Sequence, residues 1–183
     1  MTRLLLFVLG AAALAWASWP ALRQPRSHGT TRFFAWICML ALVLVNYPHW
    51  ETDPFSPRQI ASWLLLFSSP VLAVHAYRLL RTQGQPQASR AGDEALLPFE
   101  RTSTLVTSGV FRYIRHPMYT ALILLAWGAF LKDVSVPSVA LVAGATFALW
   151  LTALRDEREC LAHFGAPYAD YMRTSKRFIP LVV

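Results

Sequence analysis

The chain has 183 residues, of which 55% are hydrophobic and 15% charged, and its formal net charge at pH 7 is +7. The apolar residues are gathered into runs longer than a soluble core needs, which excludes an ordinary soluble domain and predicts a membrane protein. The basic residues lie between these runs rather than on one face, which argues against a nucleic-acid-binding protein.

Five apolar segments follow one another along the chain, and each is predicted to form a helix that crosses the bilayer. A perpendicular span needs roughly 20 residues, a length that the first, third and fifth segments reach and the other two approach. The predicted fold class is therefore all-α: a polytopic membrane protein with about five transmembrane helices and a helical C-terminal tail. The segments are residues 4–22, 33–50, 60–80, 118–131 and 134–154.

The first segment also fits a cleaved signal peptide. Arg3 precedes an apolar stretch, and the run Ala15-Trp16-Ala17 resembles a cleavage site. Multi-span proteins often keep such a helix as a membrane anchor, so both interpretations stay open.

All but three of the 17 Lys and Arg residues fall on one side of a five-span chain, the side that also holds the C-terminus. The exceptions are Arg3, Arg58 and Lys132. Basic residues are concentrated in the cytoplasmic loops of membrane proteins. We therefore expect the N-terminus outside and the C-terminus in the cytoplasm, in a bacterial inner membrane.

The polar segments on the predicted cytoplasmic side differ in composition. Residues 82–93 are rich in Gln, Gly, Ser and Ala and are typical of a loop. Residues 100–117 and 155–180 instead mix aromatic, charged and turn-forming side chains. We divide the chain accordingly into 1–95, with three spans and the loop, and 96–183, with two spans and the tail, where the chemistry is expected.

The first candidate cluster lies within residues 103–119. Pro117 suits the first turn of the fourth helix, where its missing N–H costs nothing, and the free N–H groups of that turn attract an anion. Arg115 and His116 add donors beside them, and Gly109 allows the backbone to approach a ligand closely. The cluster therefore predicts a site for a carboxylate or a phosphate.

The second candidate cluster extends the fifth helix out of the membrane. Asp156 and Glu157 fall just past the predicted bilayer edge, where carboxylates can meet a cationic ligand. Gly165 and Pro167 then end the helix, and a short helix over about 168–176 is predicted to follow. Together the clusters suit a zwitterion such as the methionine moiety of S-adenosylmethionine. Ordinary interfacial charge with snorkelling side chains is the alternative interpretation.

Several motifs in the second part resemble the isoprenylcysteine carboxyl methyltransferase family, which is related to the phospholipid N-methyltransferases. One is the Arg-His-Pro-x-Tyr core within residues 105–119, and another is the acidic pair followed by a Phe-Gly-x-x-Tyr-x-x-Tyr sequence. The resemblance covers about residues 96–180. It rests mainly on Arg115, His116, Pro117, Tyr119, Asp156, Glu157, Phe164, Gly165, Tyr168, Tyr171 and Pro180.

The resemblance implies that S-adenosyl-L-methionine is the cofactor and that it binds between the two clusters. Four residues are expected to act in catalysis, chiefly by positioning: Arg115, His116, Tyr119 and Glu157. The cofactor-binding residues that the resemblance implies are Ser103, Thr104, Leu105, Val106, Phe111, His116, Pro117, Met118, Tyr119, Asp156 and Glu157.

The resemblance also implies a lipophilic acceptor that enters from the bilayer through a gap between helices. Thr152 and Arg155 are the expected substrate contacts, and Thr152 stands where eukaryotic members carry an arginine. O-methylation is favoured over N- or S-methylation, because a carboxylate acceptor is already ionised near pH 7 and needs no base. An amine acceptor has to be deprotonated, and Glu157 or Tyr119 is then the candidate base.

Two other functions remain open. Membrane sterol reductases share a similar Arg-His-Pro region but bind NADPH, and a non-catalytic membrane protein is the second alternative. Phe111, Ala121 and Asp156 favour that second alternative, since the family pattern has Tyr, Gly and Glu at these positions. The cysteines and histidines show no metal-ligand spacing, so neither a metal nor a nucleic acid is an expected partner.

Overall fold

The computed structural model describes residues 1–87 and 96–180, and all regular structure in these residues is helical, which confirms the predicted all-α class. Part of the loop predicted at 82–93 lies outside the described residues. In chain order the α-helices are α1 (Thr2–Ala17), α2 (Trp19–Leu22), α3 (His28–Asn46), α4 (Pro57–Gln83), α5 (Pro117–Phe130), α6 (Val136–Phe164) and α7 (Ala166–Thr174). Short 3₁₀ turns occur at η1 (Tyr47–His49), η2 (Pro98–Glu100) and η3 (Gly109–Arg112).

Three helical segments in the described residues are long and apolar enough to cross a membrane: α3 together with η1, α4, and α6. Helices α1 and α5 are also apolar, but they have only 16 and 14 residues. At 1.5 Å per residue, 14 residues rise about 21 Å, less than the roughly 30 Å of a hydrocarbon core. The chain is therefore a membrane protein with three full-length candidate spans and two shorter apolar helices.

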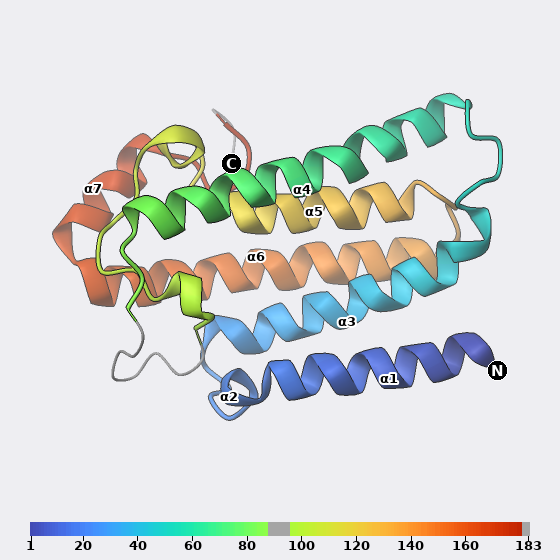
Figure 1. Cartoon of the computed structure of the whole chain (residues 1–183), viewed down its shortest axis with the longest axis horizontal. Coiled ribbons are helices and arrows are strands. Elements are labelled where there is room, and N and C mark those ends of the chain that lie inside the picture. The colour runs from blue at the N-terminus through green and yellow to red at the C-terminus, as the bar shows by residue number, and fades with distance from the viewer. Residues whose placement is uncertain (88–95, 181–183) are drawn as a thin grey trace.

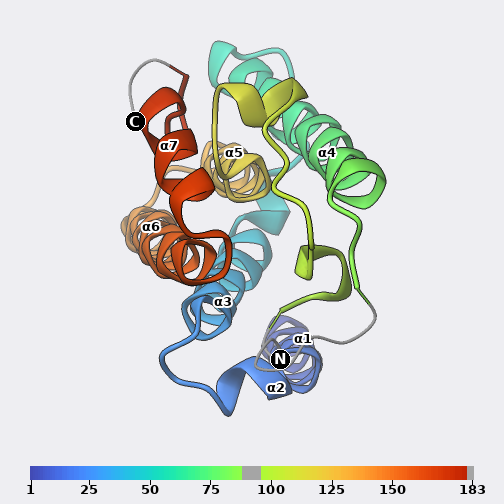
Figure 2. The same ribbon diagram turned by 90° about the vertical axis from the view of Figure 1, so that its left-hand side faces the viewer.

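Helices α1, α3, α4, α5 and α6 lie alongside one another, while α7 and the long loops gather at one end of the bundle (Figure 1). Seen from that end, α4 lies beside α5, and α1 lies beside α3 (Figure 2). The core between α3, α5 and α6 contains many small side chains, among them Ala35, Ala126 and Ala145. Small residues let helix backbones approach closely, which favours helix packing in lipid.

Hydroxyl groups and a glycine hold α4 against α5. Ser62 and Ser69 donate hydrogen bonds to the backbone oxygens of Gly128 and Ala121, at 2.7 and 2.8 Å. A Cβ atom on Gly128 would lie 2.8 Å from the Cγ atom of Leu66. The absence of a side chain at Gly128 therefore permits the close packing of these two helices.

Several predicted boundaries are wrong by a few residues, for local reasons. The first predicted segment breaks at Ser18, and Pro20 lies in the first turn of the separate helix α2. Helix α3 begins at His28 rather than at residue 33, so that Arg32 lies inside the helix. Helix α7 covers Ala166–Thr174 rather than 168–176.

Two predicted helix ends are confirmed, and they determine where the candidate clusters lie. Pro117 is the first residue of α5, with His116 as its N-cap. Helix α6 continues to Phe164, and Gly165 ends it with a φ of 63°, a backbone conformation that favours glycine. Because α5 and α6 are antiparallel neighbours, the start of α5 and the end of α6 lie at the same end of the bundle (Figure 1).

Candidate functional site

A cavity of about 870 Å³ opens at the end of the bundle where the long loops gather. Its size is in the range of small-molecule sites, roughly 300–1,000 Å³. Four stretches of chain form most of its wall, and Leu80 at the end of α4 adds to it. The stretches lie within residues 24–27, 96–106, 111–119 and 156–171.

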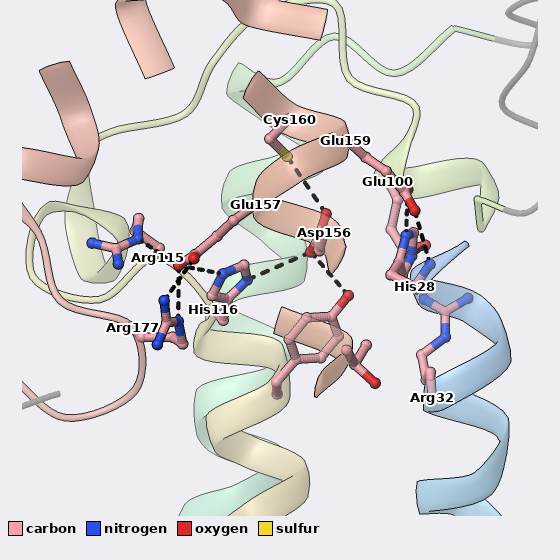
Figure 3. A network of polar contacts seen from close by, with 12 residues as sticks. His28, Arg32, Glu100, Arg115, His116, Asp156, Glu157, Glu159, Cys160 and Arg177 are labelled. Atoms are coloured by element: carbon pink, nitrogen blue, oxygen red, sulfur yellow. Dashed lines mark hydrogen bonds and ion pairs between the residues drawn. The ribbon is translucent and has the colours of Figure 1, made fainter. Parts of the chain in front are cut away.

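His116 lies at the centre of the polar wall, between two carboxylates of α6 (Figure 3). Its Nδ1 atom is 3.5 Å from Asp156 Oδ2, and its Nε2 atom is 3.4 Å from Glu157 Oε1. Tyr119 stacks on the imidazole one helical turn further on. Burial disfavours the charged imidazole, but the hydrogen bonds with the two carboxylates outweigh burial and raise the pKa of His116 above its ordinary value.

Asp156 is the carboxylate that lines the cavity. Besides His116, it accepts a hydrogen bond of 2.9 Å from the Tyr119 hydroxyl, and the Cys160 Sγ atom lies 3.5 Å from its other oxygen. These contacts fix the orientation of the Asp156 carboxylate in the wall.

Glu157 faces away from the cavity and is 4% exposed. Arg177 binds it through two hydrogen bonds of 3.0 and 2.8 Å, and Arg115 Nε donates a third of 3.0 Å. Such two-point binding of a carboxylate by arginine is strong and directional. Glu157 therefore joins α6 to the start of α5 and to the C-terminal tail.

The C-terminal tail folds back over the corner that precedes α5. The backbone of Lys176 pairs with that of Ile114, through bonds of 2.7 Å from Arg115 N–H and 2.9 Å to the Tyr113 oxygen. Arg115 Nη1 also donates to the backbone oxygens of Met172 and Ser175. The tail thus holds the Arg115–Pro117 corner in place from outside the cavity.

Nine of the predicted site residues line the cavity, and all come from the two predicted clusters. Among them, Phe111 is held by the tail, because its backbone oxygen accepts a hydrogen bond of 2.5 Å from the Tyr171 hydroxyl. The nine are Leu105, Val106, Phe111, Arg115, His116, Pro117, Met118, Tyr119 and Asp156.

The other predicted site residues lie outside the cavity wall. Ser103 and Thr104 are exposed, and their backbone N–H groups donate to the oxygen of Gly84. Glu157, as described above, supports the wall from behind. The two expected substrate contacts lie on the side of α6 that faces α3.

Thr152 and Arg155 both contact the N-terminal part of the chain. Thr152 Oγ1 is buried and donates to Ala148 oxygen in its own helix, and it lies 3.0 Å from Thr31 Oγ1. Arg155 Nη1 donates to the backbone oxygens of Pro25 and Ser27, at 2.9 and 3.1 Å. In this structure both residues therefore fasten α6 to the loop before α3 and to its first turns.

The sequence analysis missed a second charged group beside the cavity, which we call the His28 cluster (His28, Arg32, Glu100 and Glu159). Only Glu100 and Glu159 of this cluster line the cavity. Glu159 accepts the His28 backbone N–H at 2.8 Å and lies 2.6 Å from its Nδ1 atom, so this carboxylate caps the N-terminus of α3. Glu100 pairs with Arg32 Nη1 at 2.5 Å and lies 3.7 Å from His28 Nε2. Asp156 lies between this cluster and His116 (Figure 3).

The His28 cluster holds its charges where the cavity and the N-terminal helices meet. Burial disfavours the ionised form of Glu100, but the charge of Arg32 and the nearby His28 imidazole keep the pKa of Glu100 below its usual value. His28 and Arg32 are four residues apart and therefore share one helix face. This spacing is the only feature of the sequence that could have indicated the cluster. No sequence spacing linked them to Glu100 and Glu159, which belong to distant segments.

Comparison with known families matches the chain to a methyltransferase family. The sequence model of the family described as phospholipid methyltransferase matches residues 58–166. The chain belongs to the phospholipid methyltransferase family. This family includes the isoprenylcysteine carboxyl methyltransferases, so the resemblance seen in the sequence is confirmed. Searches of curated proteins and of solved structures return no match.

Membership of the phospholipid methyltransferase family is consistent with the chemistry of the site. The match begins at the start of α4 and ends just past α6, so it includes the Arg115–Pro117 corner and both acidic residues of α6. The described residues contain no group of three or more His, Cys, Asp or Glu suited to a metal ion. The wall instead offers oriented charges of both signs beside apolar and aromatic surface, which suits binding of a charged organic molecule.

Proposed function

We propose that this protein is an integral membrane methyltransferase that uses S-adenosyl-L-methionine and methylates the headgroup of a lipid-like acceptor. The observation that supports the proposal best is the cavity between the Arg115–Pro117 corner and Asp156, in a chain of the phospholipid methyltransferase family. The family match does not favour the NADPH-dependent reductase that the sequence left open.

The residues of the cavity fit the proposed cofactor. An ionised carboxylate at Asp156 suits a cationic group, and the N-terminus of α5 at Pro117 and Met118 suits a carboxylate. Phe111, Phe164 and Tyr168 supply aromatic surface for a purine. We propose that the nine lining residues contact the cofactor and that Glu157 acts by holding Arg115 and His116.

We also propose that the five longer apolar helices all span or enter the bilayer, with the N-terminus outside and the cavity at the cytoplasmic face of an inner membrane. Helices α1 and α5 fall short of a full span. Tryptophans and basic residues near the helix ends suit the membrane interface, and local thinning of the bilayer accommodates short helices at modest cost. A cavity at this level lets a membrane-resident acceptor reach it without leaving the lipid.

Methyl transfer from a sulfonium is an in-line displacement, for which the cofactor supplies the electrophilic methyl group. The protein's part is to hold the two reactants in line, which can contribute much of the rate enhancement. His116 is clamped between Asp156 and Glu157, and Tyr119 stacks on it and fixes Asp156. We propose that these residues orient the cofactor and exclude water from the reacting atoms.

The acceptor group can be a carboxylate or an amine, and different observations favour each. A carboxylate needs no base, and both oxygens of Glu157 are already bound to arginine, which does not suit a base. An amine acceptor is the second candidate, because three carboxylates, those of Glu100, Asp156 and Glu159, line the cavity. O-methylation remains our first proposal.

Ligand-induced thermal stabilisation tests the proposed function directly. The detergent-purified protein is melted with S-adenosylhomocysteine and, separately, with NADPH, because selective binding to the folded state raises the melting temperature. We expect stabilisation by S-adenosylhomocysteine alone and its loss in His116→Ala. Stabilisation by NADPH alone, or by neither compound, contradicts the proposal. Labelled S-adenosylmethionine with membrane lipid extracts, followed by mass spectrometry, then identifies the acceptor.

A further inference from the structure

A second, smaller hollow of about 180 Å³ lies next to the main cavity. Its walls come from the end of α1, from α2, from the first turns of α3 and from residues 96–101. Most of these walls are apolar, with Ala17, Pro20, Ala21 and Leu97 among them. Two arginines, Arg32 and Arg101, also line it, so the hollow combines apolar surface with positive charge.

Arg32 has a hydrogen-bonding group that the described residues leave unused. The residue is 4% exposed, and its guanidinium lies over the Trp36 ring, 5.2 Å from the ring centroid. Nη1 binds Glu100, but the buried Nε atom has no hydrogen-bond partner among the described residues. A buried donor without an acceptor is unfavourable, so Arg32 retains hydrogen-bonding capacity beyond its pair with Glu100.

The Arg32–Glu100 ion pair lies between the main cavity and the small hollow. Glu100 lines the main cavity, Arg32 lines the small hollow, and Leu96 contributes to both. Only the Glu100 side chain therefore separates a headgroup bound at Arg32 from the main cavity, where we propose that the cofactor binds. An elongated molecule can lie along Leu96 and contact both spaces.

We propose that Arg32 binds an oxyanion in the headgroup of a membrane amphiphile, and that this amphiphile is the methyl acceptor. The proposal rests on the proposed function and names the acceptor's recognition group. Arginine presents several N–H donors in a planar fork that matches a carboxylate or a phosphate. The apolar walls of the hollow, next to the exposed side chain of Trp16 at the end of α1, favour an amphiphile over a free inorganic anion.

The test compares binding of three amphiphiles with binding of the cofactor product. The probes are a short-chain phosphatidylethanolamine, an S-farnesyl thioether carboxylate and uncharged dioctanoylglycerol, titrated into the detergent-solubilised protein. S-adenosylhomocysteine is titrated in parallel. Arg32→Lys keeps the positive charge opposite Glu100 but removes the planar fork and the Nε donor. Arg158→Lys, at an exposed position of α6, is the matched control.

We expect one of the two amphiphiles that carry an oxyanion to bind the wild-type protein more tightly than dioctanoylglycerol, and the one that binds identifies the oxyanion as phosphate or carboxylate. Arg32→Lys should weaken that binding by about tenfold, the effect of losing a charge-assisted hydrogen bond. Arg158→Lys should leave it unchanged, and S-adenosylhomocysteine should bind all three proteins equally. Ala17→Phe, which fills the hollow without altering a charge, should weaken amphiphile binding as well.

Equal amphiphile affinity in the wild type, Arg32→Lys and Ala17→Phe overturns the proposal, as does binding of dioctanoylglycerol as tight as that of the two oxyanion-bearing probes. These outcomes leave the proposed function intact if S-adenosylhomocysteine still binds. Failure of S-adenosylhomocysteine to bind the wild type contradicts the proposed function instead, whatever the amphiphiles do. If Arg32→Lys fails to fold, Ala17→Phe decides the outcome.

Discussion

At the scale of single residues, the site depends on how a few buried charges are compensated. His116 meets two carboxylates, and Glu157 meets two arginines and His116. A buried charge without a partner is costly, so each group of opposite charges is stable only as a whole. Substitutions here should therefore affect stability as well as ligand binding, and the two effects have to be measured separately.

The first prediction concerns the pH dependence of stability at His116. Its folded-state pKa is raised, so the protonated imidazole stabilises the folded protein. This contribution is complete below the unfolded pKa of about 6.5 and is lost as the pH rises through the raised folded-state value. The melting temperature of the wild type relative to His116→Gln should therefore fall as the pH increases from 6 towards 10. A difference that stays constant over this range would contradict the prediction.

The second prediction concerns Arg177, which the sequence analysis did not single out. Arg177→Met removes two hydrogen bonds to Glu157, which keeps its contacts with Arg115 and His116. We expect a loss of about 1.5–3 kcal/mol of unfolding free energy. Hydrogen exchange should also become faster at residues 113–116, because the tail pairs with them.

Arg173→Met provides the matched control for the tail. Arg173 forms an ion pair with Asp170 in which both side chains are mostly exposed. Exposed ion pairs contribute little to stability, so this variant should melt like the wild type. Similar destabilisation by both variants would show that the tail does not depend on the Glu157 contacts.

At the scale of secondary-structure elements, the sequence predicted helix ends well where a backbone rule applies. Pro117 and Gly165 mark the start of α5 and the end of α6, and these two ends create the site. The start of α3 was placed too late because Arg32 and the preceding polar residues were assigned to a loop. Arg32 is instead helical and buried, because Glu100 from a distant segment compensates its charge. A partner so far away in the chain cannot be predicted from local sequence.

Helix contact between α4 and α5 gives the third prediction. Gly128→Ala puts a methyl group within 2.8 Å of Leu66 Cγ and 3.1 Å of its backbone nitrogen. Overpacking of this kind costs about 1–3 kcal/mol, more than the helix propensity that alanine gains over glycine, about 1 kcal/mol. We expect Gly128→Ala to lower the melting temperature.

Gly144→Ala is the control for that substitution. Gly144 is also inside a helix, and a Cβ atom there meets only Cys38 Sγ, at 3.4 Å. This variant should be as stable as the wild type or more so. If the Gly128→Ala protein is as stable as the Gly144→Ala protein, the contact between α4 and α5 is looser than the structure indicates.

At the scale of the whole molecule, charge is distributed unequally between the two ends of the bundle. Lys132 is one of three basic residues at the end opposite the cavity, yet its side chain is fully buried. Its Nζ atom lies 3.5 Å from the centroid of the Trp63 ring and 3.0 Å from Gln59 Oε1. The charge is thus held inside the protein by a cation–π contact and a hydrogen bond, which sequence counting could not distinguish from an exposed loop charge.

The end that holds the cavity carries the remaining basic residues of the described chain, so the positive-inside rule predicts the cytoplasmic position that we propose for it. This gives the fourth prediction, which single cysteines introduced at Asp53 and Arg173 can test after Cys38 and Cys160 are replaced by serine. Both positions are exposed, Asp53 in the loop between α3 and α4 and Arg173 in α7. A membrane-impermeant maleimide should label Asp53→Cys in intact spheroplasts and Arg173→Cys only after permeabilisation. The reverse pattern would place the cavity outside, where a cytosolic cofactor could not reach it, and labelling of both cysteines in intact cells would rule out an odd number of spans between them.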